Sequence, residues 1–327
     1  MKAEHKKLRQ LFFLSFVLMI LLCGCANISD GSENQRSQTK QTVAMITKST
    51  SSAFWKSVEA GANAACTEYN MNLIFEGPDN EEDYETQNKM IEEAVKEGAK
   101  AIVFSAVDYE ANAQSIDKAA EQGVKIVVID SDVNSANVSC RISTDNYVAG
   151  QMAGEAMLDT SKNELNIGIV NFDKNSENGQ QREKGFKDVA QADPRVNIVE
   201  TINVISTTKD ATMDLLKRHP EINCIATFNE WTSLGVGYAI QDLELANETR
   251  VVAFDSNVVS VGMLETGEVD ALIVQNPYAM GYLGIEAVSK LLAGETVSEP
   301  VVDTATTLIT RENMFTESAQ RILFTFQ

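Results

Sequence analysis

Two segments of this chain, Lys125-Ile-Val-Val-Ile-Asp130-Ser131 and Arg250-Val-Val-Ala-Phe-Asp255-Ser256, have nearly the same pattern. Each consists of a cation, four apolar residues and an Asp-Ser pair. A short apolar run between polar residues predicts a strand buried on both faces, as in a parallel sheet covered by helices. Ligands of open α/β sheets bind at the carboxyl ends of the strands. Asp130 and Asp255 are therefore candidate ligand-binding residues in two similar lobes.

The spacing of matched positions also repeats between the two halves of the chain. Strand and helix patterns alternate from Thr42 onward. Ser105 precedes Asp130 by 25 positions, and Asn229 precedes Asp255 by 26. Chance similarity among common strand sequences is the alternative explanation. The repeated layout predicts an α/β fold with two doubly wound parallel-sheet lobes and right-handed crossovers between strands.

The first residues have the pattern of an export signal. Four cations precede an apolar run over residues 11–22: Lys2, Lys6, Lys7 and Arg9. Twelve residues are few for a bilayer span, which needs roughly 20, but the arrangement is typical of a cleaved signal. The ending Leu22-Cys23-Gly24-Cys25 resembles a bacterial lipobox, which implies a signal peptide at 1–24 and a lipid on Cys25. An uncleaved anchor and an ordinary secretory signal are the alternatives, and all three export the body.

The next segment and the overall charge restrict the surroundings of the body. Residues 25–41 are mainly Ser, Asn, Gln, Gly and charged residues, which is typical of a flexible tether. The formal net charge of -20 becomes -23 without residues 1–24, which hold four Lys/Arg and one Asp/Glu. Such acidity argues against nucleic acid and anionic lipid as binding surfaces. We expect a monomer anchored by lipid to the extracytoplasmic face of a bacterial cell membrane.

The body has little of what metal or nucleophilic chemistry requires. Beyond the signal region the sequence has a single histidine, His219. No zinc-type cluster and no Ser-His-Asp or Cys-His set can be assembled from it. Cys66, Cys140 and Cys224 fall in helix or strand patterns, where we expect small buried hydrophobic residues. The sequence therefore predicts no metal site and no cofactor, and it does not favour an enzyme.

The order and spacing of several segments resemble periplasmic-binding-protein-type sugar receptors of the ribose-binding group. These receptors are the solute-binding components of ABC importers. The segments span nearly the whole mature chain: Ala53-Phe54-Trp55, Asp130-Ser131, Thr144–Gly150, Arg182–Phe186, Asn229-Glu230, Phe254-Asp255 and Gln275-Asn276-Pro277. The resemblance implies a periplasmic binding protein type I fold.

The resemblance also implies two discontinuous lobes joined by a three-crossing hinge. The crossings would fall near Ser143–Thr144, Gln275–Asn276 and Val302–Asp303. The N-terminal lobe would hold residues 42–143 and 276–302, and the C-terminal lobe would hold residues 144–275 and 303–327.

The candidate site residues match the chemistry of a sugar. A sugar presents hydroxyls around its rim and C–H faces above and below, so carboxylates and amides suit the rim and aromatic rings suit the faces. The candidate ligand-binding residues are Phe54, Trp55, Ser105, Asp130, Asn229, Asp255 and Gln275. Several of them could instead have a purely structural role: Phe54 in the core, Asp130 and Asp255 as helix N-caps, and Ser105 bonded within its own loop.

Two departures from the ribose-group pattern bear on the ligand. Ser131 follows Asp130 where such receptors commonly have Arg, and Gln180 lies where they have an Arg of the second lobe. Gln180 is thus a ligand-binding candidate, with nearby Arg182 as a weaker one. Loss of both cations argues against ribose itself. Lys48 could replace one cation, although we favour a solvated lysine, and Trp231 could stack on the ligand or pack in the core.

We expect the protein to capture a neutral polar small molecule, a monosaccharide or polyol, by closing its lobes. The captured ligand would be delivered to a membrane ABC permease. A sensory receptor that presents its closed form to a chemoreceptor or membrane kinase is the alternative, and the sequence does not separate the two. A transcriptional repressor is disfavoured by the N-terminal signal. A glycosidase with paired Asp residues is the weakest alternative.

Overall fold

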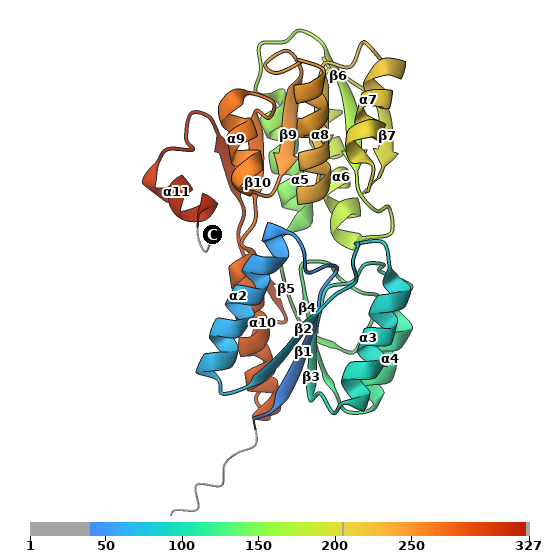
Figure 1. Cartoon of the computed structure of the whole chain (residues 1–327), viewed down its shortest axis with the longest axis vertical. Coiled ribbons are helices and arrows are strands. Elements are labelled where there is room, and N and C mark those ends of the chain that lie inside the picture. Colours follow the sequence, from blue (N-terminus) through green and yellow to red (C-terminus); the bar gives the residue numbers. More distant parts are fainter. Residues whose placement is uncertain (1–39, 205, 325–327) are drawn as a thin grey trace, which may run out of the picture. The chain divides into compact units, whose positions relative to one another are not determined.

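The computed structural model describes residues 40–204 and 206–324, which form two lobes around two six-stranded sheets (Figure 1). The α/β architecture predicted from the sequence is confirmed. The signal peptide, Cys25 and all of the tether except Lys40 and Gln41 lie outside the described residues. No helix within the described ranges is long and apolar enough to cross a membrane.

The first lobe contains a sheet with the strand order β11-β5-β4-β3-β1-β2, in which all neighbours are parallel. Its strands are β1 (Thr42–Ile46), β2 (Asn72–Glu76), β3 (Ala101–Phe104), β4 (Lys125–Ile129), β5 (Val138–Ser143) and β11 (Val301–Asp303). Four helices cover its two faces: α2 (Ala53–Glu68) and α10 (Pro277–Leu292) on one, α3 (Tyr84–Lys96) and α4 (Ala113–Glu121) on the other.

The second lobe repeats this plan with the strand order β12-β10-β9-β8-β6-β7, where only β12 is antiparallel to its neighbour. Its strands are β6 (Leu165–Asn171), β7 (Val196–Asn203), β8 (Cys224–Thr227), β9 (Arg250–Phe254), β10 (Ala271–Val274) and β12 (Thr307–Thr310). Its helices are α5 (Asn146–Leu158), α6 (Glu177–Ala190), α7 (Thr208–Arg218), α8 (Glu230–Asp242), α9 (Val258–Thr266) and α11 (Glu317–Leu323).

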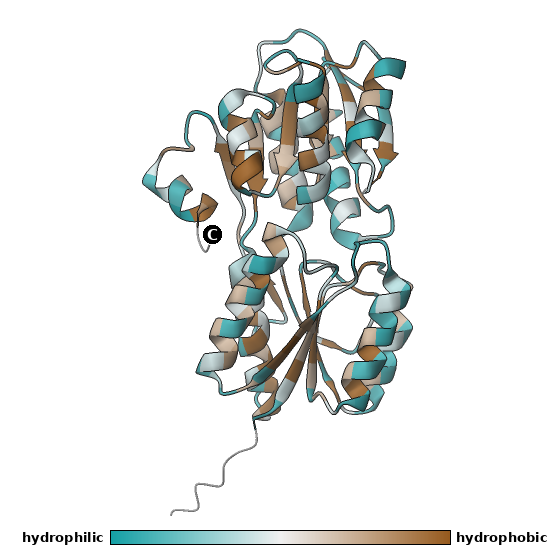
Figure 2. Cartoon of the chain, viewed as in Figure 1, coloured by the Kyte–Doolittle hydropathy of each residue, from teal (hydrophilic) through white to brown (hydrophobic). Residues whose placement is uncertain are grey.

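Alternating side chains of the strands build a core on each face of each sheet. In β1, Val43 and Met45 join the core beneath α2 and α10, whereas Ala44 and Ile46 join the core beneath α3 and α4. Successive strand residues point to opposite faces, so a strand covered by helices on both sides must be apolar throughout. Figure 2 accordingly shows largely hydrophobic strands inside both lobes and mixed helices outside them.

The chain passes between the two sheets three times, after Ser143, after Val274 and after Asp303. The third passage comes slightly later than Val302–Asp303, because Asp303 still pairs with Ser143 in the first sheet. The strand-like sequence over residues 300–310 divides into β11 and β12, which belong to different sheets. β11 pairs in parallel with β5, so β5 is an inner strand of the first sheet.

The cysteines behave as predicted. Cys66, Cys140 and Cys224 are buried free thiols. Burial raises the pKa of Cys66 and of Cys224 to about 11. Thiols of this kind remain protonated at neutral pH and act as small hydrophobic groups.

Each lobe contains one pair of helices in backbone contact, and glycines make that contact possible. In the second lobe, a Cβ atom added at Gly185 of α6 would overlap the carbonyl oxygen of Tyr147 on α5. In the first lobe, a Cβ atom at Gly281 of α10 would overlap the carbonyl oxygen of Val58 on α2. The helices that follow a hinge passage, α5 and α10, are therefore fixed tightly to their lobes.

We predict that Gly185→Ala lowers the free energy of unfolding by about 2 kcal/mol, because the added methyl group forces α5 and α6 apart. Gly262→Ala is the matched control, since Gly262 is also in a helix but has no atom within 4 Å of an added Cβ. The control should gain about 0.5–1 kcal/mol from helix propensity. Urea denaturation of both variants measures the difference, and equal stabilities would contradict the close helix contact.

Candidate functional site

The carboxyl ends of the strands of both sheets border a small cavity between the lobes. Its volume is about 20 Å³, room for about one water molecule. It is lined by Lys48, Ser52, Phe54, Trp55, Glu81 and Asp130 of the first lobe, by Phe172, Asn178, Arg182, Asn229, Glu230, Trp231 and Asp255 of the second, and by Gln275 of the hinge. The described residues therefore form a closed arrangement, and a sugar-sized molecule could enter only if the lobes separated.

A larger cavity of about 670 Å³ lies beside the hinge. It shares Phe54, Asp255 and Gln275 with the smaller one. Size alone would favour it as the ligand site. We place the site in the smaller cavity, because the buried carboxylates, amides and cations of both lobes converge there and convergent polar groups are what fix a ligand's orientation.

Asp130 follows β4 and is bonded from both lobes. Its Oδ2 accepts a hydrogen bond from Ser105 Oγ at 3.0 Å, and its Oδ1 accepts one from Asn178 Nδ2 at 3.0 Å. Arg182 Nη2 lies 3.8 Å from the same Oδ1. Asn178 and Arg182 belong to α6 of the second lobe, so Asp130 is a first-lobe carboxylate partnered across the cleft.

Asp255 follows β9 in the equivalent position of the second lobe. Its Oδ1 accepts a hydrogen bond from Gln275 Nε2 at 2.7 Å. Both carboxylates stand on residues with positive φ, 56° for Asp130 and 67° for Asp255. Asp tolerates this left-handed conformation better than most residues. The repeated backbone geometry thus turns the two side chains out of their strands at equivalent places.

Arg182 is the most extensively bonded cation of the site, with a side chain only 1% exposed. Its donors reach three acceptors on the second lobe and the hinge: Asn146 Oδ1 at 2.8 Å, the Phe228 carbonyl at 2.7 Å and Gln275 Oε1 at 2.6 Å. Gln275 Oε1 also accepts from Thr144 Oγ1 at 2.9 Å. A buried guanidinium requires such partners, and Thr144 and Gln275 both lie in hinge passages.

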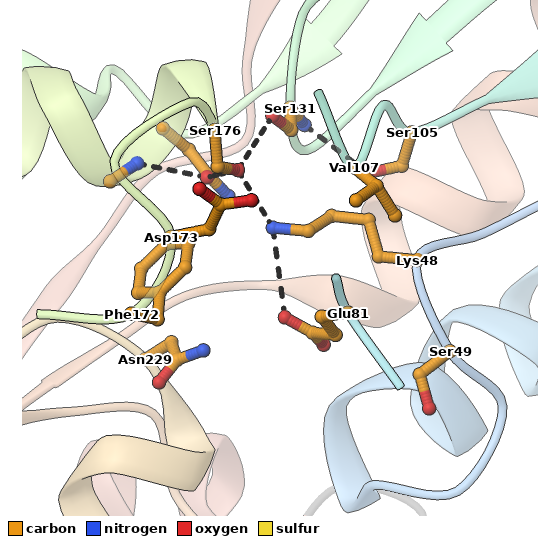
Figure 3. A network of polar contacts seen from close by, with 12 residues as sticks. Lys48, Ser49, Glu81, Ser105, Val107, Ser131, Phe172, Asp173, Ser176 and Asn229 are labelled. Atoms are coloured by element: carbon orange, nitrogen blue, oxygen red, sulfur yellow. Dashed lines mark hydrogen bonds and ion pairs between the residues drawn. The ribbon is translucent and has the colours of Figure 1, made fainter. Parts of the chain in front are cut away.

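Lys48 is the second cation, and it extends from the first lobe to the second (Figure 3). Its Nζ donates to Ser176 Oγ at 2.9 Å, lies 3.6 Å from Glu81 Oε2 and sits 4.7 Å from the centre of the Phe172 ring. Ser176 and Phe172 belong to the second lobe. The expectation of a solvated lysine is therefore wrong, because the side chain is 1% exposed and its charge is compensated by an ion pair and an aromatic face.

Aromatic rings form part of the cavity wall. Phe54 and Trp55 pack edge to face, with ring centres 4.9 Å apart and planes at 84°. Trp55 Nε1 donates to Glu81 Oε1 at 2.8 Å, which fixes the plane of the indole ring. Both rings also belong to the core of the first lobe. Phe54 is therefore a core residue that also lines the cavity. Phe172 and Trp231 line the cavity from the second lobe.

Asn229 carries a donor that the described residues do not satisfy. Its Oδ1 accepts from the backbone N–H of Thr232 at 2.9 Å and caps α8. Its Nδ2 is buried and has no hydrogen-bond partner within residues 40–204 and 206–324. A buried unsatisfied amide costs about 1–3 kcal/mol. Because Asn229 lines the cavity, a ligand acceptor at this point would remove that cost.

The structure corrects the role expected of Gln180. Its side chain is exposed, and its Nε2 donates to the carbonyl of Lys174 at 2.8 Å. Arg182, two residues later, points to Asp130 instead. The cavity therefore does contain two cations, Lys48 and Arg182, so the argument against ribose no longer has the loss of both cations to support it.

Hydrogen bonds also decide the roles of Asp130, Asp255 and Ser105. Helix N-capping by Asp255 is wrong, because Asn257 caps α9. Asp130 leads into a loop before β5, so it caps no helix either. Ser105 is fully buried and bonds Asp130, and it is not among the residues that line the cavity.

Five residues of the cavity wall were not predicted: Ser52, Glu81, Phe172, Asn178 and Glu230. A sequence signal existed for Asn178, which lies four residues before Arg182 and hence on the same face of a helix. Glu81 follows the Gly77-Pro78 break at the end of β2. That position is at the carboxyl edge of the sheet, where ligands of such folds bind.

A family model described as the periplasmic binding protein domain matches residues 43–296. A D-ribose/D-allose-binding protein of Pseudomonas aeruginosa is 26% identical over 83% of this chain and 89% of that protein. A carbohydrate transporter solute-binding protein from Agrobacterium radiobacter, solved with D-arabinose, is 29% identical with a TM-score of 0.84 and covers 88% of this chain and 99% of that one. A sugar transporter from Clostridium phytofermentans is 32% identical with a TM-score of 0.77, over 83% of this chain and 100% of that one.

The chain belongs to the periplasmic binding protein family. Its fold, its two lobes and its relatives are those of a substrate-binding transport protein that acts outside the cytoplasm, not of an enzyme.

Asp255 links the stability of this protein to pH. Burial raises the pKa of its carboxyl group from 3.8 to about 7, although Arg182 and the Gln275 hydrogen bond oppose the shift. Folding therefore takes up a proton between about pH 4 and pH 7. The contribution of this group to the free energy of unfolding is complete below about pH 4 and is lost as the pH rises through 7.

We predict that Asp255→Asn weakens this pH dependence, because an amide does not ionise. Urea unfolding at pH 5 and pH 8 measures the effect, and the free energy of unfolding should fall less with pH in the variant than in the wild type. Glu177, whose pKa is also raised to about 7 by burial and by Asp132, contributes to both proteins and cancels in the comparison. An identical fall in both proteins would show that Asp255 is ionised in the folded state.

Proposed function

We propose that this protein captures one neutral polyhydroxylated molecule, a monosaccharide or polyol, between its lobes and delivers it to an ABC importer. The observation that carries the proposal is the cavity itself. Carboxylates, amides and aromatic rings from both lobes meet there, and the buried Asn229 amide has a donor that no described residue satisfies. Hydroxyls can both donate to the carboxylates and accept from that amide.

The charge balance of the cavity favours an uncharged ligand. Lys48 pairs with Glu81, and Arg182 lies beside Asp130. Both cations already have carboxylate partners, so an anionic sugar would bring a charge that neither cation is free to match. Asp255 has a pKa of about 7 and is readily neutral in the closed form. A neutral hydroxyl donor suits it better than an ion.

The gap between Lys48 and Glu81 suits one ligand hydroxyl. Lys48 Nζ and Glu81 Oε2 are 3.6 Å apart, beyond ordinary hydrogen-bond distance. A hydroxyl oxygen to one side of this pair, within hydrogen-bond distance of both atoms, would accept from the ammonium and donate to the carboxylate, as a bridging water does elsewhere. Trp55, bonded to the same Glu81, would then lie beside the C–H face of the sugar ring.

The relatives support the same class of ligand. They include the D-ribose/D-allose-binding protein, a ribose import binding protein of Bacillus subtilis at 22% identity, and the solute-binding protein solved with D-arabinose. Import rather than sensing is favoured, because the relatives include import binding proteins.

Calorimetry with D-ribose, D-allose, D-arabinose, D-fucose and several polyols tests the proposal, and absence of heat with all of them would overturn it.

We predict that Asp255→Ala weakens sugar binding by about 1–3 kcal/mol, because the ligand hydroxyl that bonded the carboxyl group is left buried without a partner. Isothermal titration with the tightest sugar of the panel measures the loss. Gln180→Ala is the control, because that side chain is exposed and bonds its own loop, and its affinity should equal that of the wild type. An unchanged affinity in Asp255→Ala would remove this carboxylate from the site.

We also propose that the mature protein begins at Cys25, carries lipid there, and is held as a monomer at the outer face of the cell membrane by the tether. The body needs only a short link for this purpose, because β1 begins at Thr42.

We predict that Cys25→Ala moves the protein from the membrane fraction to the soluble fraction, because one apolar run of twelve residues anchors poorly once no lipid is attached. Immunoblotting of fractionated cells measures the change, and mass spectrometry of the wild type should show the acyl mass on Cys25. Retention of the variant in the membrane fraction would favour an uncleaved anchor.

A further inference from the structure

The carboxylate of Glu230 joins the lobes through backbone groups. Glu230 is the first residue of α8 in the second lobe, and its oxygens accept from the N–H groups of Ala53 at 3.3 Å and Phe54 at 3.1 Å. Ala53 and Phe54 open α2 of the first lobe, where the first N–H groups of a helix have no acceptor within it. The positive end of the α2 dipole further favours a carboxylate at this place.

The second lobe holds Glu230 ready for this contact. Asn257 Nδ2 donates to Glu230 Oε1 at 2.8 Å. The Oδ1 atom of the same amide caps α9 by accepting from the N–H groups of Val259 and Ser260, both at 2.9 Å. Both ends of the Asn257 side chain are therefore used within the second lobe, and the direction of the Glu230 carboxylate is set by its own lobe.

The contact exists only while the lobes are closed. If the lobes separate, the two N–H groups of α2 and one side of the carboxylate return to water. In the closed form Glu230 is more than nine-tenths buried. Its carboxylate accepts hydrogen bonds from three donors, two of them from the opposite lobe. A buried carboxylate without these donors would be costly, so the closed form satisfies this carboxylate only with α2 in place.

We propose that Glu230 is a latch that stabilises the closed form independently of the ligand. This inference rests on the proposed function only where ligand affinity serves as a readout. The apparent dissociation constant equals the intrinsic one divided by the populated fraction of the binding-competent form. In this proposal the ligand-bound form is also closed: the side chains around the cavity are displaced by the sugar, and the contact of Glu230 with α2 is kept. A latch that favours closing therefore strengthens binding of every ligand by the same factor.

This common factor separates a latch from a ligand contact. Glu230 also lines the cavity, so loss of affinity in a Glu230 variant does not by itself reveal its cause. A lost ligand contact would affect sugars unequally, because their hydroxyls differ in position at any one point of the cavity. A lost latch would affect all of them equally.

The test uses Glu230→Ala and Asn257→Asp in the full-length protein. Aspartate can still cap α9, but it places a second carboxylate against Glu230, and position 257 does not line the cavity. Asp242→Ala, at the exposed far end of α8, is the matched control. We expect small-angle scattering of both test variants without ligand to give a larger radius of gyration than the wild type, while the control matches it.

Calorimetry with D-ribose, D-allose and D-arabinose supplies the second readout. We expect each test variant to lose at least tenfold in affinity for every sugar that binds, because the two hydrogen bonds that α2 donates to a charged group are lost in Glu230→Ala and weakened in Asn257→Asp. An unchanged radius of gyration without ligand would overturn the latch, as would losses that differ severalfold between sugars. If none of the sugars binds the wild type, the proposed ligand class fails, and the scattering comparison alone decides the latch.

Discussion

Every charge buried between the two lobes must have a partner, and this requirement organises the site. An unpaired ion in a protein interior costs several kcal/mol. Lys48 meets Glu81 and Ser176, Arg182 lies beside Asp130 and bonds Gln275, and Glu230 meets the first amides of α2. Most of these sets include one group from each lobe. Water solvates these groups when the lobes separate, whereas in the closed form they must satisfy one another. Closing is therefore favourable only if all of these partners meet together.

The repeated architecture explains how the partners come to face one another. Both sheets place a left-handed Asp after a buried strand, at φ of 56° and 67°, so each lobe offers one carboxylate to the cleft. The hinge links them: Gln275 bonds Asp255 and Arg182, and Arg182 lies beside Asp130. Gln275, a hinge residue, thus contacts Asp255 directly and Asp130 through Arg182. A ligand that binds either carboxylate therefore alters the hydrogen bonds of a hinge passage, which must rotate when the lobes move.

The sequence was most informative where one residue's position follows from one strand. Asp130, Asn229 and Asp255 each end an apolar run, and the carboxyl edge of a parallel sheet is a defined place. It was less informative where the position depends on the face of a helix, as for Gln180 and Arg182, since an error of two residues on a helix points to the opposite side. Contacts across the cleft, such as Lys48 with Ser176 or Glu230 with α2, depend on two lobes meeting and leave no local pattern.

The hydrogen bonds that the site forms with itself in the closed state also restrict which ligands can bind. Asn178 bonds Asp130 across the cleft at 3.0 Å, and Lys48 bonds Ser176 at 2.9 Å. An entering molecule must replace such bonds or add to them, because a buried donor or acceptor left unpaired costs about 1–3 kcal/mol. A sugar with one misplaced hydroxyl therefore binds more weakly for two reasons: its own hydroxyl is left without a partner, and so is the protein group that it does not reach. Discrimination between close isomers then comes from the hydrogen bonds of the closed form, while the latch at Glu230 governs how readily that form is reached.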